Sequence, residues 1–256
     1  MCSARVSATI ITCNEEKNIG ACLESIAWAD EIVVVDSLST DRTVDICRGY
    51  TQKIIQRPWP GHVQQKQFAL EQATGDWILS LDADERLASG AREEILQAVA
   101  AAAPDTCGFL FPRHSFYLGR WINHGGWYPD YKLRLIRKGS GRWGGIDPHD
   151  KLEVAGKTVT LKSEILHFVY RNLSHQLATV DSFSGITARQ WQEQGRAFRL
   201  LPLLIRPPLK FFECYLWKQG FRDGLPGFII AVASSFYVFL KYAKLWEGQH
   251  RPSTDA

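Results

Sequence analysis

Three carboxylates crowd into residues 82–85, where the sequence reads Asp82-Ala83-Asp84-Glu85. They follow an apolar run at residues 77–81 that has the composition of a buried strand. Negative charges this close repel one another unless a cation lies among them. A solvated turn is one interpretation, and a metal site is the other. Alternate residues of an extended segment point to one side, so Asp82 and Asp84 could both reach a hard cation such as Mg²⁺ or Mn²⁺.

The elements that must position this cluster alternate between strand and helix over the first hundred residues. Apolar and β-branched runs predict strands at residues 6–12, 31–36, 53–56 and 77–81. Apolar residues at helical spacing predict helices at residues 16–26, 42–48, 63–73 and 93–102. Such an alternation predicts an α/β fold with a mainly parallel sheet and right-handed crossovers.

Polar and acidic residues follow three of these strands at the point where each strand ends. In strand order they are Thr12, Asn14, Glu15, Asp36, Asp82 and Asp84. The carboxyl ends of parallel strands meet at one edge of the sheet, where such sheets bind their ligands. One such group alone would be read as a turn, but three together predict a site for a nucleotide and a metal ion.

Composition excludes several classes of protein. The chain has 256 residues, which is long enough for a globular domain. Its composition, 45% hydrophobic and 22% charged, is typical of globular proteins. A net charge of +3 is too small to indicate a nucleic-acid partner. Its six cysteines form no CxxC pair, which favours reduced thiols in the cytoplasm. The first residues lack the pattern of a signal peptide, and we expect a cytoplasmic protein.

The motifs around the strand ends resemble those of a known family. "TCNEE" at residues 12–16, "VVVDSLSTDRT" at 33–43 and "DADE" at 82–85 resemble, in order and spacing, the family 2 glycosyltransferases of GT-A fold. Ser37 and Leu38 stand where that family usually has Asp and Gly. Later segments, "GGWYPDYKLRLIRK" at 125–138, "PHDKLEVAG" at 148–156 and "ILHFVY" at 165–170, resemble the lipopolysaccharide core β-1,4-glucosyltransferases.

This resemblance implies a fold, a reaction and a division of the chain. The fold would be GT-A, a Rossmann-like and mainly parallel sheet flanked by helices, with a C-terminal helical membrane-associating extension. The reaction would be an inverting transfer of a hexose from a nucleotide sugar such as UDP-glucose, assisted by Mg²⁺ or Mn²⁺. Residues 1–105 would bind the nucleotide sugar, 106–198 the acceptor, 199–247 the membrane, and 248–256 would form a tail.

Site residues follow from the same resemblance. Asp84 would be the direct metal ligand, with Asp82 on the ribose or the metal, and Glu85 a charge at a helix start. The other donor-binding residues would be Thr12, Asn14, Glu15, Asp36 and Lys66. The Asp36 carboxylate could accept the imide N–H of uracil. Lys66 would reach the pyrophosphate, although a solvated helical lysine is the alternative. His167 is either a buried core residue or a third metal ligand.

An inverting transfer needs one base to take the proton of the acceptor hydroxyl. Asp130, Asp147 and Asp150 are the candidates, and we favour Asp150 because it stands in "PHD", where the subfamily usually has His-Glu. His149 would orient Asp150 or contact the acceptor. Nine aromatic residues lie between Phe109 and Trp143, and "NHGGWYPD" at 123–130 is expected to offer Trp127 and Asp130 to the acceptor.

The C-terminal part carries the basic charge. Residues 171–256 hold 11 Lys and Arg against 6 Asp and Glu. Residues 200–217 mix leucines and aromatics with Arg206 and Lys210, and residues 224–240 contain no charge. A buried hairpin and a membrane-spanning helix are alternatives. We favour an interfacial anchor on the inner face of the cytoplasmic membrane, where a lipid-linked saccharide acceptor would also lie. A cut near Leu200 would then release a soluble protein.

Three other functions are alternatives. A nucleotidyltransferase would show a Gly-rich phosphate loop near the N-terminus, but Gly20 is the first glycine. A non-catalytic, membrane-tethered nucleotide-sugar-binding protein would have no reason to keep the acidic strand ends. A transferase acting on another cell-envelope polysaccharide or a polyprenyl-linked glycan fits the same residues.

Overall fold

The computed structural model describes residues 4–146 and 149–250, and it divides into two compact units. The first unit runs to His114 and resumes with Asp130–Phe168, and the second contains Ser115–Pro129 and the chain from Val169 onward. These boundaries differ from the predicted division at residue 105. The strands after Asp130 complete the sheet of the first unit, while α5 (Leu173–Glu193) packs on α7 (Gly224–His250) in the second.

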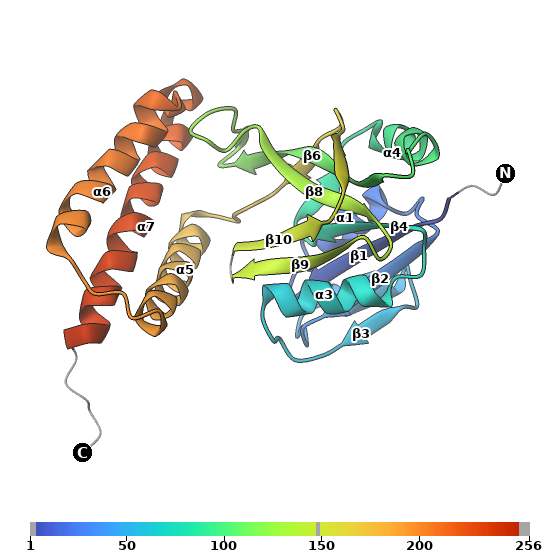
Figure 1. Cartoon of the computed structure of the whole chain (residues 1–256), viewed down its shortest axis with the longest axis horizontal. Helices are drawn as coiled ribbons and strands as arrows, with labels where there is room; N and C mark the ends of the chain where they lie inside the picture. The colour runs from blue at the N-terminus through green and yellow to red at the C-terminus, as the bar shows by residue number, and fades with distance from the viewer. Residues whose placement is uncertain (1–3, 147–148, 251–256) are drawn as a thin grey trace, which may run out of the picture. The chain divides into compact units, whose positions relative to one another are not determined.

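The first unit is built on a mixed sheet whose strand order is β3-β2-β1-β4-β8-β6-β12-β5 (Figure 1). Its parallel part is β1 (Val6–Thr12), β2 (Glu31–Asp36), β3 (Ile54–Gln56) and β4 (Trp77–Asp82). The later strands are β5 (Glu85–Leu87), β6 (Thr106–Tyr117), β8 (Asp130–Arg137) and β12 (Ile165–His167). β8 runs antiparallel to both β4 and β6, so the sheet is parallel only in its first half.

The register of the parallel strands places the acidic strand ends side by side. Thr12 pairs with Asp36 across β1 and β2, and Ile11 pairs with Asp82 across β1 and β4. The predicted strands at residues 6–12, 31–36 and 77–81 are therefore confirmed, together with the edge at which their carboxyl ends meet.

Helices cover both faces of this sheet. The main core lies between the sheet and α1 (Ile19–Ser25), α2 (Thr43–Arg48) and α4 (Ala91–Ala100). On the other face α3 (His62–Gln72) packs against β1, β2 and β9 (Figure 1). β9 (Gly141–Ile146) and β10 (His149–Val154) form a separate antiparallel pair, and β11 (Lys157–Thr160) adds to β6. All four predicted helices are present, each with slightly different ends.

The second unit is helical. α6 (Leu200–Phe212) and α7 lie side by side, and α5 packs on α7 (Figure 1). A π-helical turn at Glu213–Trp217 and a 3-10 turn at Gly220–Asp223 connect α6 to α7, and the short β7 (Arg120–Trp121) pairs with the end of β6. Among the described residues, only Gly220–His250 is long and apolar enough to cross a membrane, judged by length and composition alone.

Candidate active site

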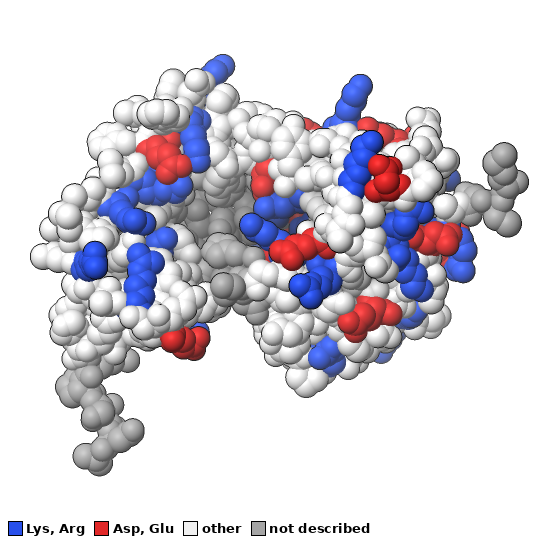
Figure 2. Space-filling view, viewed as in Figure 1, with Lys and Arg blue, Asp and Glu red and all other residues white. Residues whose placement is uncertain are grey.

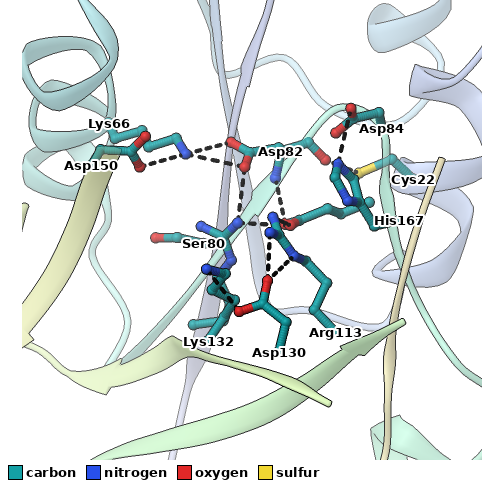
Figure 3. Close-up of polar contacts among 12 residues, drawn as sticks. Cys22, Lys66, Ser80, Asp82, Asp84, Arg113, Asp130, Lys132, Asp150 and His167 are labelled. Carbon is teal, nitrogen blue, oxygen red and sulfur yellow. Dashed lines mark hydrogen bonds and ion pairs between the residues drawn. The ribbon is translucent and has the colours of Figure 1, made fainter. Parts of the chain in front are cut away.

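Charged side chains at the carboxyl edge of the parallel strands form one continuous chain of ion pairs. Its members alternate in sign, in the order Asp150, Lys66, Asp82, Arg134, Glu85, Arg113, Asp130 and Lys132. Most of these residues are labelled in Figure 3, where the dashed lines connect neighbouring members. The chain joins residues from α3, β4, β5, β6, β8 and β10, so it draws on both the parallel and the antiparallel strands.

Lys66 is the second member of this chain, between Asp150 and Asp82, and lies on the buried face of α3. Its side chain is only 7% exposed, which excludes the solvated helical lysine considered as an alternative. Nζ lies 2.8 Å from Asp82 Oδ1 and 2.8 Å from Asp150 Oδ2, and 4.7 Å from the ring centre of Trp143. The ammonium group of Lys66 thus contacts both Asp82, at the end of β4, and the predicted base Asp150, on β10.

Asp82 is held in its charged form. Burial alone would raise the pKa of Asp82, but the nearby Lys66 and Arg134 outweigh it and hold the pKa well below its usual range. Arg134 Nη2 lies 2.9 Å from Asp82 Oδ2, so both oxygens of this carboxylate contact a cation. In this arrangement Asp82 binds protein cations, and its role toward the ribose or a metal stays a prediction.

Glu85 and Arg134 form the buried centre of the chain. Glu85 is fully buried and Arg134 is 4% exposed, and Arg134 Nη2 lies 2.7 Å from Glu85 Oε1. Burial would raise the pKa of Glu85, but Arg134 and Arg113 lower it on balance. Glu85 begins β5, so the expectation of a charge at a helix start was wrong. It also accepts a hydrogen bond from the backbone N–H of Asp82, at 3.1 Å, and so shapes the turn that carries Asp84.

Asp84 occupies a different position from Asp82, because Ala83 and Asp84 form a turn that interrupts the alternation of an extended strand. Its Oδ2 lies 3.4 Å from His167 Nε2 (Figure 3). Within the described residues no group of three or more His, Cys, Asp and Glu side chains could hold a metal ion. A carboxylate and an imidazole still fit a divalent cation such as Mn²⁺ that takes its other ligands from substrate phosphates.

Asp130 and Asp150, two of the three candidate bases, have different surroundings. Asp130 Oδ2 lies 2.7 Å from Arg113 Nη2, and its Oδ1 lies 3.0 Å from Lys132 Nζ. Burial would raise the pKa of Asp130, but these two cations lower it on balance. Asp150, by contrast, contacts Lys66 as its one cation among the described residues. Asp147 and Pro148 lie outside the described residues, and His149 is placed by its backbone only, in β10.

The loops after β1 and β2 are bonded to each other through the predicted donor-binding residues. Asn14 Oδ1 accepts from the backbone N–H of Thr40 at 2.8 Å, and the backbone N–H of Glu15 donates to Thr43 Oγ1 at 2.8 Å. Asp36 is fully buried, and its Oδ2 accepts from the backbone N–H of Ser39 at 2.9 Å and from Gln56 Nε2 at 3.0 Å.

Two features of these loops point to a ligand or to local strain. Thr12 is buried, and its hydroxyl has no hydrogen-bond partner in the part of the chain that the structure describes, so it could bond a ligand. Leu38 has φ of 59° and is 53% exposed. This left-handed conformation is strained for leucine and suits the glycine that the resembling family usually has at this position.

A cavity of about 450 Å³ opens beside the ion-pair chain. Its charged lining consists of Lys66, Asp82, Arg113, Lys132, Arg134, Asp150 and Lys151, and its aromatic lining of Tyr131 and Trp143. Polar groups that converge on a cavity of this size are typical of small-molecule sites. Trp127 lies in the second unit, packed with Tyr117 and Tyr170, and its contact with the acceptor stays a prediction.

Sequence reasoning missed Glu85, Arg113, Arg134 and Trp143. A signal for part of this set was present, because Asp130, Lys132 and Arg134 alternate along β8 and so lie on one face of the strand. Arg113 gave no comparable signal, since only the pairing of β6 with β8 brings it opposite Asp130.

The chain is similar to known glycosyltransferases. The family model described as glycosyl transferase family 2 matches residues 7–152, which include β2 to β4, Lys66, Asp84 and Asp150. The chain is 34% identical over 260 residues to the lipopolysaccharide core biosynthesis glycosyltransferase LpsC of Rhizobium meliloti, covering 98% of this chain and 96% of the relative. It is also 29% identical over 255 residues to an uncharacterized glycosyltransferase of Rickettsia bellii, covering 95% and 86%.

Solved structures share the fold at low sequence identity. The mannosyltransferase PcManGT of Pyrobaculum calidifontis, solved with GDP-Man and Mn²⁺, has a TM-score of 0.57 at 16% identity and covers 98% of this chain and 89% of its own. S. aureus TarS, solved as residues 1–349 with UDP-GlcNAc, has a TM-score of 0.50 at 15% identity and covers 96% and 91%.

Proposed function

The chain belongs to glycosyl transferase family 2 and is a glycosyltransferase, and on this premise we propose that it adds a hexose to a lipid-linked saccharide such as the lipopolysaccharide inner core. The proposed donor is a UDP-sugar, with UDP-glucose as the first candidate. Support for the acceptor comes from the relative LpsC, which is matched over nearly its whole length. Support for a nucleotide diphosphate sugar comes from the fold shared with PcManGT and TarS.

The observation that carries this proposal is the pair of contacts made by Lys66. The predicted base Asp150 and the strand-end Asp82 both lie 2.8 Å from the same ammonium group, and all three line the 450 Å³ cavity. An inverting transfer needs a base on one side of the sugar and stabilisation of the leaving diphosphate on the other. A lysine between two carboxylates can bond to the incoming diphosphate and leave Asp150 free to accept a proton.

In the proposed mechanism Asp150 takes the proton of the acceptor hydroxyl while that oxygen forms its bond to the anomeric carbon. The bond from this carbon to the diphosphate oxygen breaks, and the nucleoside diphosphate leaves with its electron pair. Arg134 and Arg113 keep the neighbouring carboxylates ionised and fixed, so the cavity keeps its shape as charge moves. Asp84 and His167 would hold a divalent cation, which when bound neutralises the charge of the diphosphate.

Acceptor-dependent release of nucleoside diphosphate tests this function. The purified protein would be given UDP-glucose, UDP-galactose, UDP-N-acetylglucosamine and GDP-mannose in turn, with Mn²⁺ and truncated lipopolysaccharide. We expect release from a UDP-hexose only when acceptor is present, and a product whose anomeric configuration is inverted by NMR. If the acceptor increases the consumption of none of these donors, the proposed donor and acceptor are wrong.

The base is tested by a matched pair of variants. Asp150→Asn should lower kcat about 10²–10⁴-fold, the range of general-base loss, with UDP binding close to wild type. Asp130→Asn serves as the control, because both oxygens of the Asp130 carboxylate already form ion pairs, with Arg113 and with Lys132. The kcat of this variant should stay within about tenfold of wild type. The reverse pattern would make Asp130 the base.

A further inference from the structure

The helical second unit contains a cavity of its own. Its volume is about 340 Å³. The lining consists of Arg196, Ala197, Arg199, Pro202, Arg206 and Tyr242. Three of these six residues are arginines and none is acidic, which distinguishes this cavity from the one beside the ion-pair chain, where carboxylates and cations alternate.

Helical spacing brings further positive charge to this side of α6. Pro202, Arg206 and Lys210 recur at intervals of four residues along α6, with Arg199 one turn before them at the start of the helix. α7 adds Lys241, the neighbour of the lining residue Tyr242. Figure 2 shows Lys and Arg side chains gathered over the helices of this unit, with few acidic side chains among them on that face.

These cations contact aromatic rings instead of carboxylates. The Arg196 guanidinium lies 3.9 Å from the ring centre of Trp191, and its Nη2 donates to Tyr242 Oη at 3.3 Å. Lys241 Nζ lies 5.2 Å from the ring centre of Trp191. Among the described residues, Arg196, Arg199, Arg206 and Lys241 form no ion pair, and only Lys210 has an acidic partner, Glu213 at 3.1 Å.

Such crowding of like charge is costly. Burial lowers the pKa of Lys241, and the positive charges of Arg206, Arg196 and Lys210 lower it further. The aromatic rings offset this repulsion only weakly, because a cation–π contact at a partly exposed position is a weak interaction. Cations held together without carboxylates are typical of sites where an anion binds.

The start of α6 adds to the positive potential. Arg199 is the N-cap residue, and none of the described side chains accepts a hydrogen bond from the first amides of the helix. These amides and the helix dipole favour an anion at this end. The guanidinium groups of Arg199 and Arg206 present planar, forked donors that match a phosphate group.

We propose that this cavity binds the phosphate group of an anionic membrane lipid. Leu201, Leu204 and Ile205 lie on the neighbouring face of α6 and are 44–66% exposed, so acyl chains could lie against them while the headgroup enters the cavity. A volume of about 340 Å³ is large for a single phosphate ion and suits a phosphate with its glycerol. The inference rests on the membrane association proposed for α6 and α7, and it adds a defined headgroup site.

Vesicle binding of the full-length protein tests the site. Vesicles of phosphatidylcholine alone measure general membrane association, and vesicles that also contain phosphatidylglycerol measure headgroup recognition. For the Arg199→Gln/Arg206→Gln double variant we expect binding to the mixed vesicles to fall about 25-fold, since each cation at an anionic surface contributes about fivefold. Binding to phosphatidylcholine should be unchanged.

A charge-matched control separates the site from general attraction. Arg189→Gln/Arg222→Gln removes two exposed arginines of the same unit that do not line the cavity, and should weaken binding less than about fivefold. If both double variants lose binding to the mixed vesicles equally, net charge alone explains the effect and the proposed headgroup site is wrong. Circular dichroism would confirm that each variant keeps its helix content.

The source of the phosphate is tested by soluble glycerol 3-phosphate. This ester lacks the acyl chains that would lie along α6, and we expect it to compete only weakly with vesicles. If it binds as tightly as the vesicles do, the ligand is a free phosphate ester and the lipid assignment is wrong. If the wild-type protein binds neither kind of vesicle, the site and the proposed membrane association both fail, whereas binding to both kinds with equal strength overturns only the site.

Discussion

Lys66 forms ion pairs with two carboxylates, Asp82 and the proposed base Asp150. A lysine whose side chain is only 7% exposed needs carboxylates beside it to offset the cost of burying its charge, and Asp82 and Asp150 meet that need. The same contacts keep the base occupied while no diphosphate is present. When a diphosphate arrives, its charge competes for Lys66, so we expect donor binding to precede the release of Asp150 for catalysis.

At the residue scale, Asp84 is the proposed metal ligand. Asp84→Asn should lower kcat about 10²–10³-fold, because a neutral amide binds a divalent cation weakly and the charge of the leaving diphosphate is then less well stabilised. Mn²⁺ binding in the presence of UDP, followed by electron paramagnetic resonance, should weaken in parallel. His167→Ala should have the same direction of effect.

A surface carboxylate provides the control for Asp84. Asp45→Asn changes an exposed residue of α2 that pairs only with Arg48 among the described residues, and it should leave both Mn²⁺ binding and turnover unchanged. Undiminished transfer by Asp84→Asn in the presence of EDTA would show that the reaction needs no metal at this carboxylate.

The residues that could be recognised from sequence were those whose neighbours in the chain explain them. Asp36, Asp82 and Asp84 lie at or just after the ends of apolar runs, and the carboxyl ends of parallel strands meet at one edge of the sheet. Glu85 looked like a surface charge because its partners Arg113 and Arg134 come from β6 and β8, 28 and 49 residues along the chain. No local sequence pattern predicts a contact between strands that are far apart in the chain.

At the element scale, the parallel half of the sheet was predictable and the antiparallel half was not. β1, β2 and β4 are almost completely buried, and continuous apolar runs identify such strands. β8 alternates charged and apolar residues and joins β4 to β6 in antiparallel pairing, which requires the whole chain between them to fold back. The aromatic-rich middle segment indicated a change of architecture without indicating its topology.

Glu31 connects β2 to β1 and to the segments just before β3 and just after α3, and its ionisation should contribute to stability. At the start of β2 its carboxylate accepts from Ser7 Oγ at 2.5 Å, from Lys53 Nζ at 2.8 Å and from the backbone N–H of Thr74 at 2.7 Å. Burial would raise its pKa, but Lys53, Ser7 and Thr74 lower it from 4.5 to about 2.

A carboxylate whose folded pKa is depressed stabilises the protein above its unfolded pKa. We therefore expect the Glu31 contribution, up to about 3 kcal/mol, to be complete above about pH 4.5 and to be lost as the pH falls toward 2. Glu31→Gln should lower the free energy of unfolding at neutral pH and flatten its dependence on pH in that acidic range, as measured by urea denaturation. Glu71→Gln, an exposed carboxylate on α3, is the control; an equal loss there would refute the assignment.

At the scale of the whole molecule, exposed apolar side chains are concentrated in the second unit. Among the described residues, 23 large hydrophobic side chains are exposed, and 15 of them lie between Leu200 and Trp246. Their exposed fractions reach 66% at Leu201 and 87% at Trp217. So many exposed apolar side chains in one unit are unusual for a soluble monomer, which argues against the buried hairpin and for a surface that meets lipid.

A cut near Leu200 would be a poor test of this surface. α5 packs on α7, and Val180, Ser184 and Ala188 of α5 are buried. Removal of α6 and α7 would expose these residues, so the fragment could aggregate for reasons unrelated to a membrane. Substitutions on the exposed face of α6 leave the packing between helices intact.

The membrane prediction therefore concerns two leucines of α6. Leu201 and Leu204 are 66% and 61% exposed, so Leu201→Gln/Leu204→Gln should leave the stability of the fold within about 0.5 kcal/mol. Each leucine withdrawn from lipid loses about 1.5 kcal/mol or more of transfer free energy, so membrane binding should fall more than about tenfold. Leu173→Gln/Leu177→Gln on α5, at 44% and 53% exposure, is the matched control and should bind as the wild type does. We expect the wild-type protein to sediment with inner membranes and to be released in part by high salt or mild detergent, and the α6 variant to stay in the supernatant. Full recovery of the wild-type protein in the soluble fraction at low salt would contradict the interfacial anchor and leave the apolar face of α6 to another partner.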